Sequence, residues 1–207
     1  MSTLTMIRHG ESHGNINEKT ESTATNPLTP RGKTQAIKVA DKIYKIFPPG
    51  IIIYSPYLRT EQTAAPFKER YLKTITEKWP IQEFTYLSAT KYANTNMSER
   101  QPARNAYWDK LDPDYVDGDG AESYNQMILR AERFIRKFLQ NGYTSAVAFT
   151  HGQFMKAVLL LLQTEGFHDR RPTMKEFYYY HLALNIPNTG IVNINFTQQS
   201  KPNISFS

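Results

Sequence analysis

The feature that most constrains the fold of this chain is a run of four apolar residues, Ile51–Tyr54. The segment Pro-Pro-Gly at 48–50 precedes the run and Ser55-Pro56 follows it, so turn residues mark both ends. A continuous β-branched run of this length is typical of a strand that is buried on both faces of a parallel sheet. Parallel strands need crossover connections, usually helices, so the chain is expected to alternate between strands and helices.

The rest of the sequence matches this alternation. Thr29 and Pro30 form a helix start, with Thr29 as the N-cap and Pro30 at the first helical position. From residue 121 to 139 apolar side chains recur at helical spacing, and Asn141-Gly142 ends that helix. Strands are expected over 3–9, 51–54 and 145–150, a strand end at 79–84, and edge strands over 190–196 and 203–206. Helices are expected over 30–47, from residue 55 onward, around 103–111, and over 121–139, 152–162 and 177–184.

These elements predict a fold of the α/β class, a three-layer α/β/α arrangement with a mainly parallel central sheet. A chain of 207 residues with 40% hydrophobic residues suits a single domain spanning 1–207. Residues 77–120 are the least regular stretch, and long irregular excursions in compact domains are usually functional. We expect this stretch to form a cap over the edge of the sheet where the strands end.

The composition excludes several classes of function. The chain contains no cysteine, which excludes disulfides, thiolate nucleophiles and cysteine-based zinc sites. The net charge is +6, but the basic residues are scattered, so a nucleic-acid partner is not expected. The longest apolar run, Ala157–Leu162, is too short to cross a bilayer, and the first residues lack a signal-peptide pattern. A cytoplasmic protein without a membrane partner is expected, and the oligomeric state stays open.

Charged and polar side chains follow three of the predicted strands. Arg8-His9 end the first strand, Arg59 lies a few residues after the second, and His151-Gly152 end the strand at 145–150. The carboxyl ends of parallel strands share one edge of a sheet, where functional groups of open α/β folds collect. Two histidines and two arginines are therefore expected to converge there, with Glu83 as a candidate fifth member.

This set of side chains suits phosphoryl transfer. Guanidinium groups match phosphate oxygens and stay charged at any working pH. A neutral imidazole can attack phosphorus, and a second histidine, if protonated, would stabilise the transferring group. A carboxylic acid could protonate the leaving oxygen and then activate water. No metal would be required, because Arg8, Arg59 and His151 would supply the positive charge.

The motifs also resemble those of a known family, in the same order along the chain and over residues 3 to about 160. The family is the histidine phosphatase (phosphoglycerate mutase-like) superfamily. The matching segments are Leu4–Ser12 with Asn15, Pro27–Gly32 with Gln35-Ala36, Tyr54–Ala64, and Phe149–Gly152.

The resemblance implies a role for each residue. His9 would become a phosphohistidine, in a phosphate pocket of Arg8, Arg59 and His151. Asn15 would donate a further hydrogen bond, Gly152 would contact the substrate, and Glu83 would be the proton donor. The implied activity is that of a metal-independent, acid-type histidine phosphatase without a cofactor, acting on a small phosphorylated metabolite or another phosphomonoester.

Several alternatives stay open from the sequence. The Glu-Arg-x-Tyr-Gly run of cofactor-dependent phosphoglycerate mutases is missing, which favours a phosphatase over that isomerase. A non-enzymatic phospho-ligand or protein-binding module is a third interpretation. Another acid within 77–122 could replace Glu83 as the donor, and His9 with His13 could instead bind zinc. Asn94, Asn96, Arg100 and Arg104 could meet a second anionic group, and His168 and His181 are expected to be structural or exposed.

Overall fold

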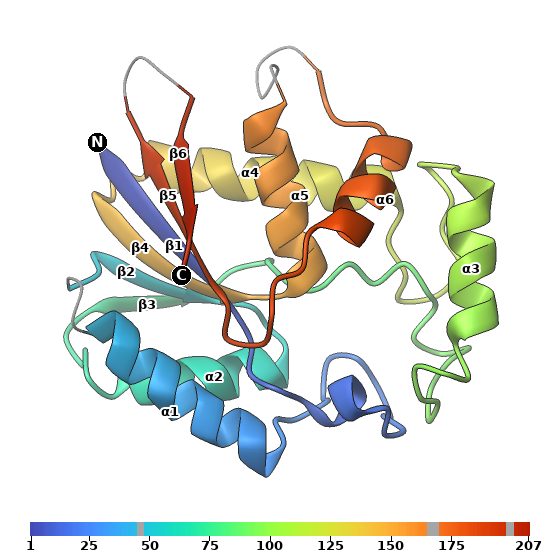
Figure 1. Cartoon of the computed structure of the whole chain (residues 1–207). Coiled ribbons are helices and arrows are strands. Elements are labelled where there is room, and N and C mark those ends of the chain that lie inside the picture. The colour runs from blue at the N-terminus through green and yellow to red at the C-terminus, as the bar shows by residue number, and fades with distance from the viewer. Residues whose placement is uncertain (45–47, 165–169, 198–200) are drawn as a thin grey trace.

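The computed structural model describes residues 1–44, 48–164, 170–197 and 201–207 (Figure 1). Their strands form one mixed sheet in the order β3-β2-β4-β1-β5-β6. The first four of these strands are mutually parallel, whereas β5 runs antiparallel to β1, and β6 to β5. The bounds are β1 (Ser2–Arg8), β2 (Ile51–Tyr54), β3 (Ile75–Lys78), β4 (Ser145–Thr150), β5 (Ile191–Phe196) and β6 (Asn203–Phe206).

Helices cover both faces of the sheet, which confirms the predicted three-layer α/β/α fold. On one side lie α1 (Pro30–Tyr44) and α2 (Leu58–Lys68), and on the other α4 (Tyr124–Gln140), α5 (Gly152–Gln163) and α6 (Met174–Ala183) (Figure 1). The apolar run Ile51–Tyr54 in β2 fits a sheet that is covered by helices on both faces. Ile52 joins the core beneath α1 and α2, whereas Ile51 and Ile53 join the larger core on the opposite face. Side chains alternate along a strand, so a run without polar residues serves both faces.

The predicted cap contains α3 (Gln101–Lys110), which stands beside α6 and is joined to the body by long irregular segments (Figure 1). Aromatic residues attach it to the larger core. The ring centroid of Trp108 lies 5.2 Å from that of Tyr178 and 6.2 Å from that of Phe177, and Tyr107 lies 6.0 Å from Phe84. The cap is therefore held by packing against the helical layer.

The structure corrects the expected strand end at 79–84. The strand is β3, at 75–78, and residues 79–84 have no regular structure. Pro80 cannot donate to a sheet ladder. Trp79 and Ile81 are apolar because they are buried in the larger core, at 2% and 0% exposure.

Several helix boundaries also differ from expectation. The helix expected from residue 55 is α2 and begins at Leu58, and the helix expected from residue 121 is α4 and begins after its N-cap Ser123. The helix expected from Phe177 is α6 and begins three residues earlier, after a capping box at Thr173. The loop after β1 contains a short 3-10 helix, His13–Ile16, although its glycines argue against helix. Phe47, expected on the buried face of α1, lies outside the described residues.

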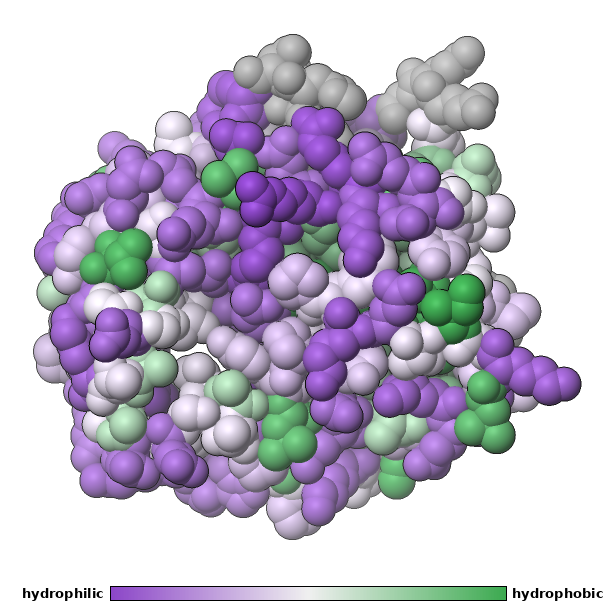
Figure 2. All heavy atoms as spheres, turned by 180° about the vertical axis from the view of Figure 1, so that it is seen from behind, coloured by the Kyte–Doolittle hydropathy of each residue, from purple (hydrophilic) through white to green (hydrophobic). Residues whose placement is uncertain are grey.

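No helix in the described part of the chain is long and apolar enough to cross a membrane. The face turned away from the view of Figure 1 is largely hydrophilic, with apolar residues scattered over it (Figure 2).

Candidate active site

The carboxyl ends of the parallel strands open into a cavity of about 330 Å³. Six of the seven predicted site residues line it, and they come from four separate parts of the chain. His151 does not line the cavity but is fully buried beside it, with its ring centroid 5.1 Å from that of His9. The lining residues among the predicted set are Arg8, His9, Asn15, Arg59, Glu83 and Gly152.

His9 is held by backbone on both sides. Its N–H donates to the carbonyl of Thr150 (2.9 Å), and its ring Nδ1 lies 2.7 Å from the carbonyl of Gly10. A carbonyl can only accept, so Nδ1 carries the proton and Nε2 keeps a free lone pair. Burial lowers the pKa of His9 well below its usual value, and the charges of Arg59 and Arg8 lower it further. The imidazole is therefore neutral, as a nucleophile must be.

Arg8 and Arg59 approach the cavity from two elements. Arg59 is buried in the first turn of α2 and donates to the carbonyl of Thr23 (2.5 Å) and to His151 Nδ1 (2.9 Å). Burial lowers the pKa of Arg59 to about 10, partly offset by the charge of Glu83. Arg8 donates to the carbonyl of Ile186 (2.6 Å), while its buried Nε has no partner among the described residues. That unpaired donor beside Gly152 suits an anion in the cavity.

His151 differs from the state considered from sequence. Its Nδ1 accepts from Arg59, so Nε2 carries the proton and donates to the Ser55 hydroxyl (2.8 Å). Burial lowers the pKa of His151 well below its usual value, and the neighbouring charge of Arg59 adds to this shift. The ring is neutral here, and its visible role is to orient Arg59. A protonated His151 would require an anion to offset that positive charge.

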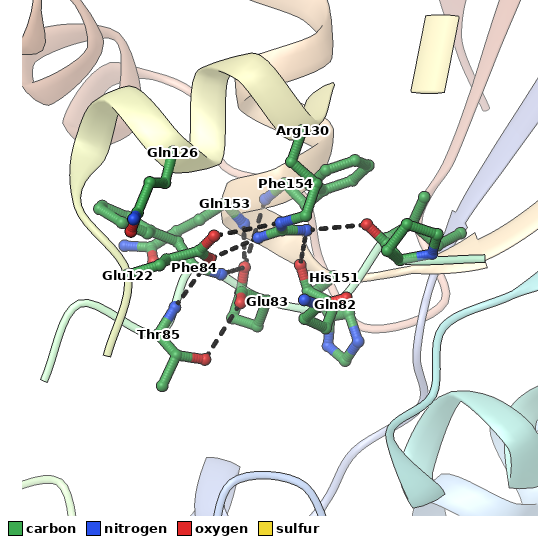
Figure 3. A network of polar contacts seen from close by, with 12 residues as sticks. Gln82, Glu83, Phe84, Thr85, Glu122, Gln126, Arg130, His151, Gln153 and Phe154 are labelled. Carbon is green, nitrogen blue, oxygen red and sulfur yellow. Dashed lines mark hydrogen bonds and ion pairs between the residues drawn. The ribbon is translucent and has the colours of Figure 1, made fainter. Parts of the chain in front are cut away.

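Glu83 binds the amino-terminal end of α5. Its Oε1 accepts from the backbone N–H groups of Gln153 (3.0 Å), Phe154 (3.2 Å) and its own neighbour Phe84 (3.1 Å) (Figure 3). Negative charge is stabilised at the start of a helix, where backbone donors lack intrahelical partners. One carboxylate oxygen thus fixes the side chain, and Oε2 has no hydrogen-bond partner among the described residues.

Glu122 is another acid of the 77–122 region that was open as a proton donor, but in the structure it is engaged in an ion pair. It forms an ion pair with Arg130 and accepts from the N–H of Thr85 (3.4 Å) (Figure 3). Arg130 also donates to the carbonyls of Gln82 (2.8 Å) and Pro80 (3.2 Å). This network supports the irregular segment that carries Glu83, and Glu122 does not line the cavity.

Asn15 lies on the cavity rim at the end of the 3-10 helix. Its Oδ1 accepts from the Ser12 backbone N–H (3.1 Å) and from the side-chain amide of Asn188 (3.1 Å). With the oxygen occupied, the Asn15 amide nitrogen is the group that can donate to a ligand. Asn188 also donates to the His9 carbonyl (3.0 Å), so this residue, missed from sequence, connects the two predicted site residues.

Two further cavity residues were not identified from the sequence. Lys156 of α5 is 8% exposed and donates to the carbonyl (2.9 Å) and ring Nδ1 (3.2 Å) of His181. Burial lowers the pKa of His181 to about 4, and the charge of Lys156 contributes. His181, expected to be structural or exposed, contacts Lys156 and also lines the cavity. A lysine directly before the apolar run Ala157–Leu162 was the sequence signal that could have identified Lys156.

The remaining expectations concern polar residues near the site. His13 pairs with Glu18 (2.6 Å) and does not line the cavity, so it does not join His9 as the zinc alternative would require. Across the described ranges no group of three histidine or acidic side chains could hold a metal ion. Arg100 and Arg104 line the cavity, whereas Asn94 and Asn96 lie outside its lining. His168 lies outside the described residues.

Comparison with known proteins identifies a family that this chain matches. The model of the histidine phosphatase superfamily (branch 1) matches residues 4–200. A comparison with curated proteins gives no significant match.

Solved structures with the same fold cover the whole chain. A phosphoserine phosphatase mutant from Entamoeba histolytica, in complex with phosphoserine, is 24% identical, with a TM-score of 0.74 over 100% of this chain and 96% of its own. A putative alpha-ribazole-5'-P phosphatase from Escherichia coli is 18% identical (TM-score 0.75, 100% and 94%). A mycobacterial glucosyl-3-phosphoglycerate phosphatase is 18% identical (TM-score 0.74, 100% and 98%). These neighbours show the same fold. Family membership supports a phosphatase activity, and the chain belongs to the histidine phosphatase superfamily.

Proposed function

We propose that this protein hydrolyses small phosphomonoesters through a phosphohistidine formed on His9. The observation that carries the proposal is the hydrogen bond from His9 Nδ1 to the Gly10 carbonyl, at 2.7 Å. It fixes the tautomer whose Nε2 can attack phosphorus, and burial together with two arginines keeps that nitrogen unprotonated.

In the first step His9 Nε2 forms a bond to phosphorus, and the bond from phosphorus to the ester oxygen breaks. Arg8 and Arg59 bind the equatorial phosphoryl oxygens, with Asn15 and the Gly152 end of α5 beside them. Their fixed positive charges compensate the charge of the transferring group, so the reaction is proposed to need no metal and no cofactor. A Glu83 carboxylic acid gives its proton to the departing alkoxide, which leaves as an alcohol.

In the second step water attacks the phosphohistidine and transfers its proton to Glu83. The bond between phosphorus and Nε2 breaks, which restores neutral His9 and the Glu83 acid and releases inorganic phosphate. His151 is assigned to this cycle through Arg59. His151 accepts a hydrogen bond from Arg59 at Nδ1 (2.9 Å) and so keeps in place the guanidinium that binds the phosphoryl group.

The test is chemical trapping of the intermediate. The wild-type chain, quenched during turnover of an aryl phosphate, should carry an acid-labile phosphoryl group on His9, located by mass spectrometry under alkaline conditions. His9→Ala should lose the modification and at least about 1000-fold in kcat, because the nucleophile is gone. His13→Ala is the matched control, since His13 lies four residues away and outside the cavity.

Three outcomes contradict the proposal. Full hydrolysis by the His9→Ala variant would exclude the nucleophile. Loss of wild-type activity in a chelator would exclude a metal-independent reaction. Return of the phosphoryl group to another position of a phosphoglycerate, in place of release to water, would assign the protein to the mutases.

A further inference from the structure

The part of the cavity away from His9 carries more positive charge than a phosphate monoester needs. Two arginines at the phosphate end match the dianion of such an ester. Three more basic side chains line the wall formed by α3 and α5. The arginines and lysine of the lining are Arg8, Arg59, Arg100, Arg104 and Lys156, against the two acidic residues Glu21 and Glu83.

Arg100 is the N-cap of α3 and Arg104 lies in its first turn, four residues later, and both are half-buried. Like charges at this spacing destabilise a helix, and burial together with the charge of Arg104 lowers the pKa of Arg100. Neither arginine has a carboxylate within ion-pairing distance in the described part of the chain, because the adjacent Glu99 pairs with Lys19 (2.9 Å). Two arginines held together without an ion-pair partner suit an anionic ligand in the cavity that they line.

The donors of these arginines are partly free. Among the described residues the guanidinium of Arg100 makes one hydrogen bond, to the carbonyl of Thr95 (3.3 Å). Arg104 donates through Nε to the Tyr86 hydroxyl (3.0 Å) and weakly to Gln101 (3.4 Å). Since a guanidinium has five N–H donors, each keeps several for a ligand. The contact with Tyr86 fixes the direction of the Arg104 side chain.

Lys156 faces the same space from α5. His181 accepts two hydrogen bonds from its ammonium group, through the ring Nδ1 and the carbonyl. An ammonium group has three N–H donors, so one stays for a ligand. Lys156 lines the same cavity as Arg8 and Glu83 at the phosphate end and as Arg104 on α3.

We propose that Arg100, Arg104 and Lys156 form a second anion subsite, which binds a carboxylate or phosphate on the leaving group of the substrate. The preferred substrates would then be small phosphomonoesters with a second negative group, such as phosphorylated hydroxy acids. A cavity of about 330 Å³ accommodates such a molecule. This assignment rests on the proposed phosphatase function, since it names the substrate class of the same site.

The experiment compares three compounds on one carbon skeleton. 3-Phosphoglycerate has a carboxylate where glycerol 3-phosphate has a hydroxymethyl group, and glycerol 1,3-bisphosphate has a second phosphate there. We expect kcat/KM for at least one of the two doubly anionic compounds to exceed that for glycerol 3-phosphate by roughly 10- to 100-fold, the range of a hydrogen bond to a charged group. Which of the two is preferred identifies carboxylate or phosphate as the second anion.

The variant Arg100→Gln/Arg104→Gln should reduce this preference to about twofold or less, since only the doubly anionic compounds use the arginines. The control Lys33→Gln/Lys38→Gln removes the same charge from exposed positions of α1 and should keep the wild-type preference. A general loss of folded protein would lower all rates together and leave the ratio unchanged. Should the double variant not fold, each single arginine variant is measured in its place.

Binding is measured in parallel by calorimetry on His9→Ala, which cannot be phosphorylated. If no compound is hydrolysed but the doubly anionic ones bind more tightly, the subsite stands and the proposed reaction fails. If hydrolysis occurs with ratios near one in the wild type, or with ratios that the arginine variants do not change, the subsite is refuted while the phosphatase stands.

Discussion

Glu83→Gln separates the structural role of Glu83 from its chemical role. In the structure Oε1 accepts from the N–H groups of Phe84, Gln153 and Phe154 at 3.0–3.2 Å. A glutamine oxygen can accept the same three bonds, so the start of α5 should keep its geometry. The amide cannot deliver a proton, which removes the general acid and leaves arginines and nucleophile in place.

The size of the effect should depend on the leaving group. General acid catalysis contributes roughly 100- to 10,000-fold, which is about 3–5 kcal/mol of barrier. An alkoxide needs that proton, whereas p-nitrophenolate is stable without it. We therefore expect kcat/KM to fall by at least about 100-fold for an alkyl phosphate and by less than about 10-fold for p-nitrophenyl phosphate.

The second step gives an independent readout. Without a base for water the phosphohistidine should accumulate, so Glu83→Gln should release one equivalent of nitrophenol in a burst followed by a slow phase. Rapid mixing measures the burst, and steady-state assays give both kcat/KM values. Asp109→Asn is the control, because this carboxylate belongs to the same region but is exposed and lies outside the cavity. Equal slowing of both substrates, or the same pattern in Asp109→Asn, would refute the role of Glu83.

Two further predictions follow from the buried histidines and from Arg59. The pKa values of His9 and His151 are lowered by folding, so below their ordinary value of 6.5 the unfolded chain binds protons that the folded chain does not. Stability is then full above pH 6.5 and falls toward pH 5, by up to about 1.4 kcal/mol per pH unit for each histidine. Urea unfolding at pH 7.5, 6.0 and 5.0 measures this slope, and a flat profile would contradict it. Arg59→Lys keeps the charge but loses the fork that reaches Thr23 and His151, so KM for a phosphomonoester should rise about 10- to 100-fold. Exposed Arg31→Lys should leave KM within about twofold, and an equally small change in Arg59→Lys would count against a phosphate-binding role.

The convergence of Arg8, His9, Arg59 and His151 could be predicted because it follows from sheet topology. Parallel strands deliver whatever follows them to one edge, and β1, β2 and β4 are adjacent in the sheet. The apolar runs of these strands are visible in sequence because both faces of the sheet are covered.

Features that depend on long-range contacts could not be read in this way. β3 is an exposed edge strand, so Ile75–Lys78 lacks an apolar signature, and the buried Trp79 and Ile81 gave the stronger signal. The protonation of His151 follows from Arg59 and Ser55, which are 92 and 96 residues away in sequence. Lys156 resembles a solvated helix residue until α6 brings His181 to it.

At the junction of β4 and α5, one short stretch of backbone carries His151 and Gly152 and binds Glu83 through two of its N–H groups. Glu83 and the phosphate-binding groups are therefore positioned by the same segment of backbone. The α3 arginines stand on a different part of the chain, attached through the aromatic packing of Trp108. Because of this division, the cap can be exchanged without moving the catalytic groups. Replacing residues 91–119 by another segment should change substrate preference and leave the distance between His9 and Glu83 unchanged.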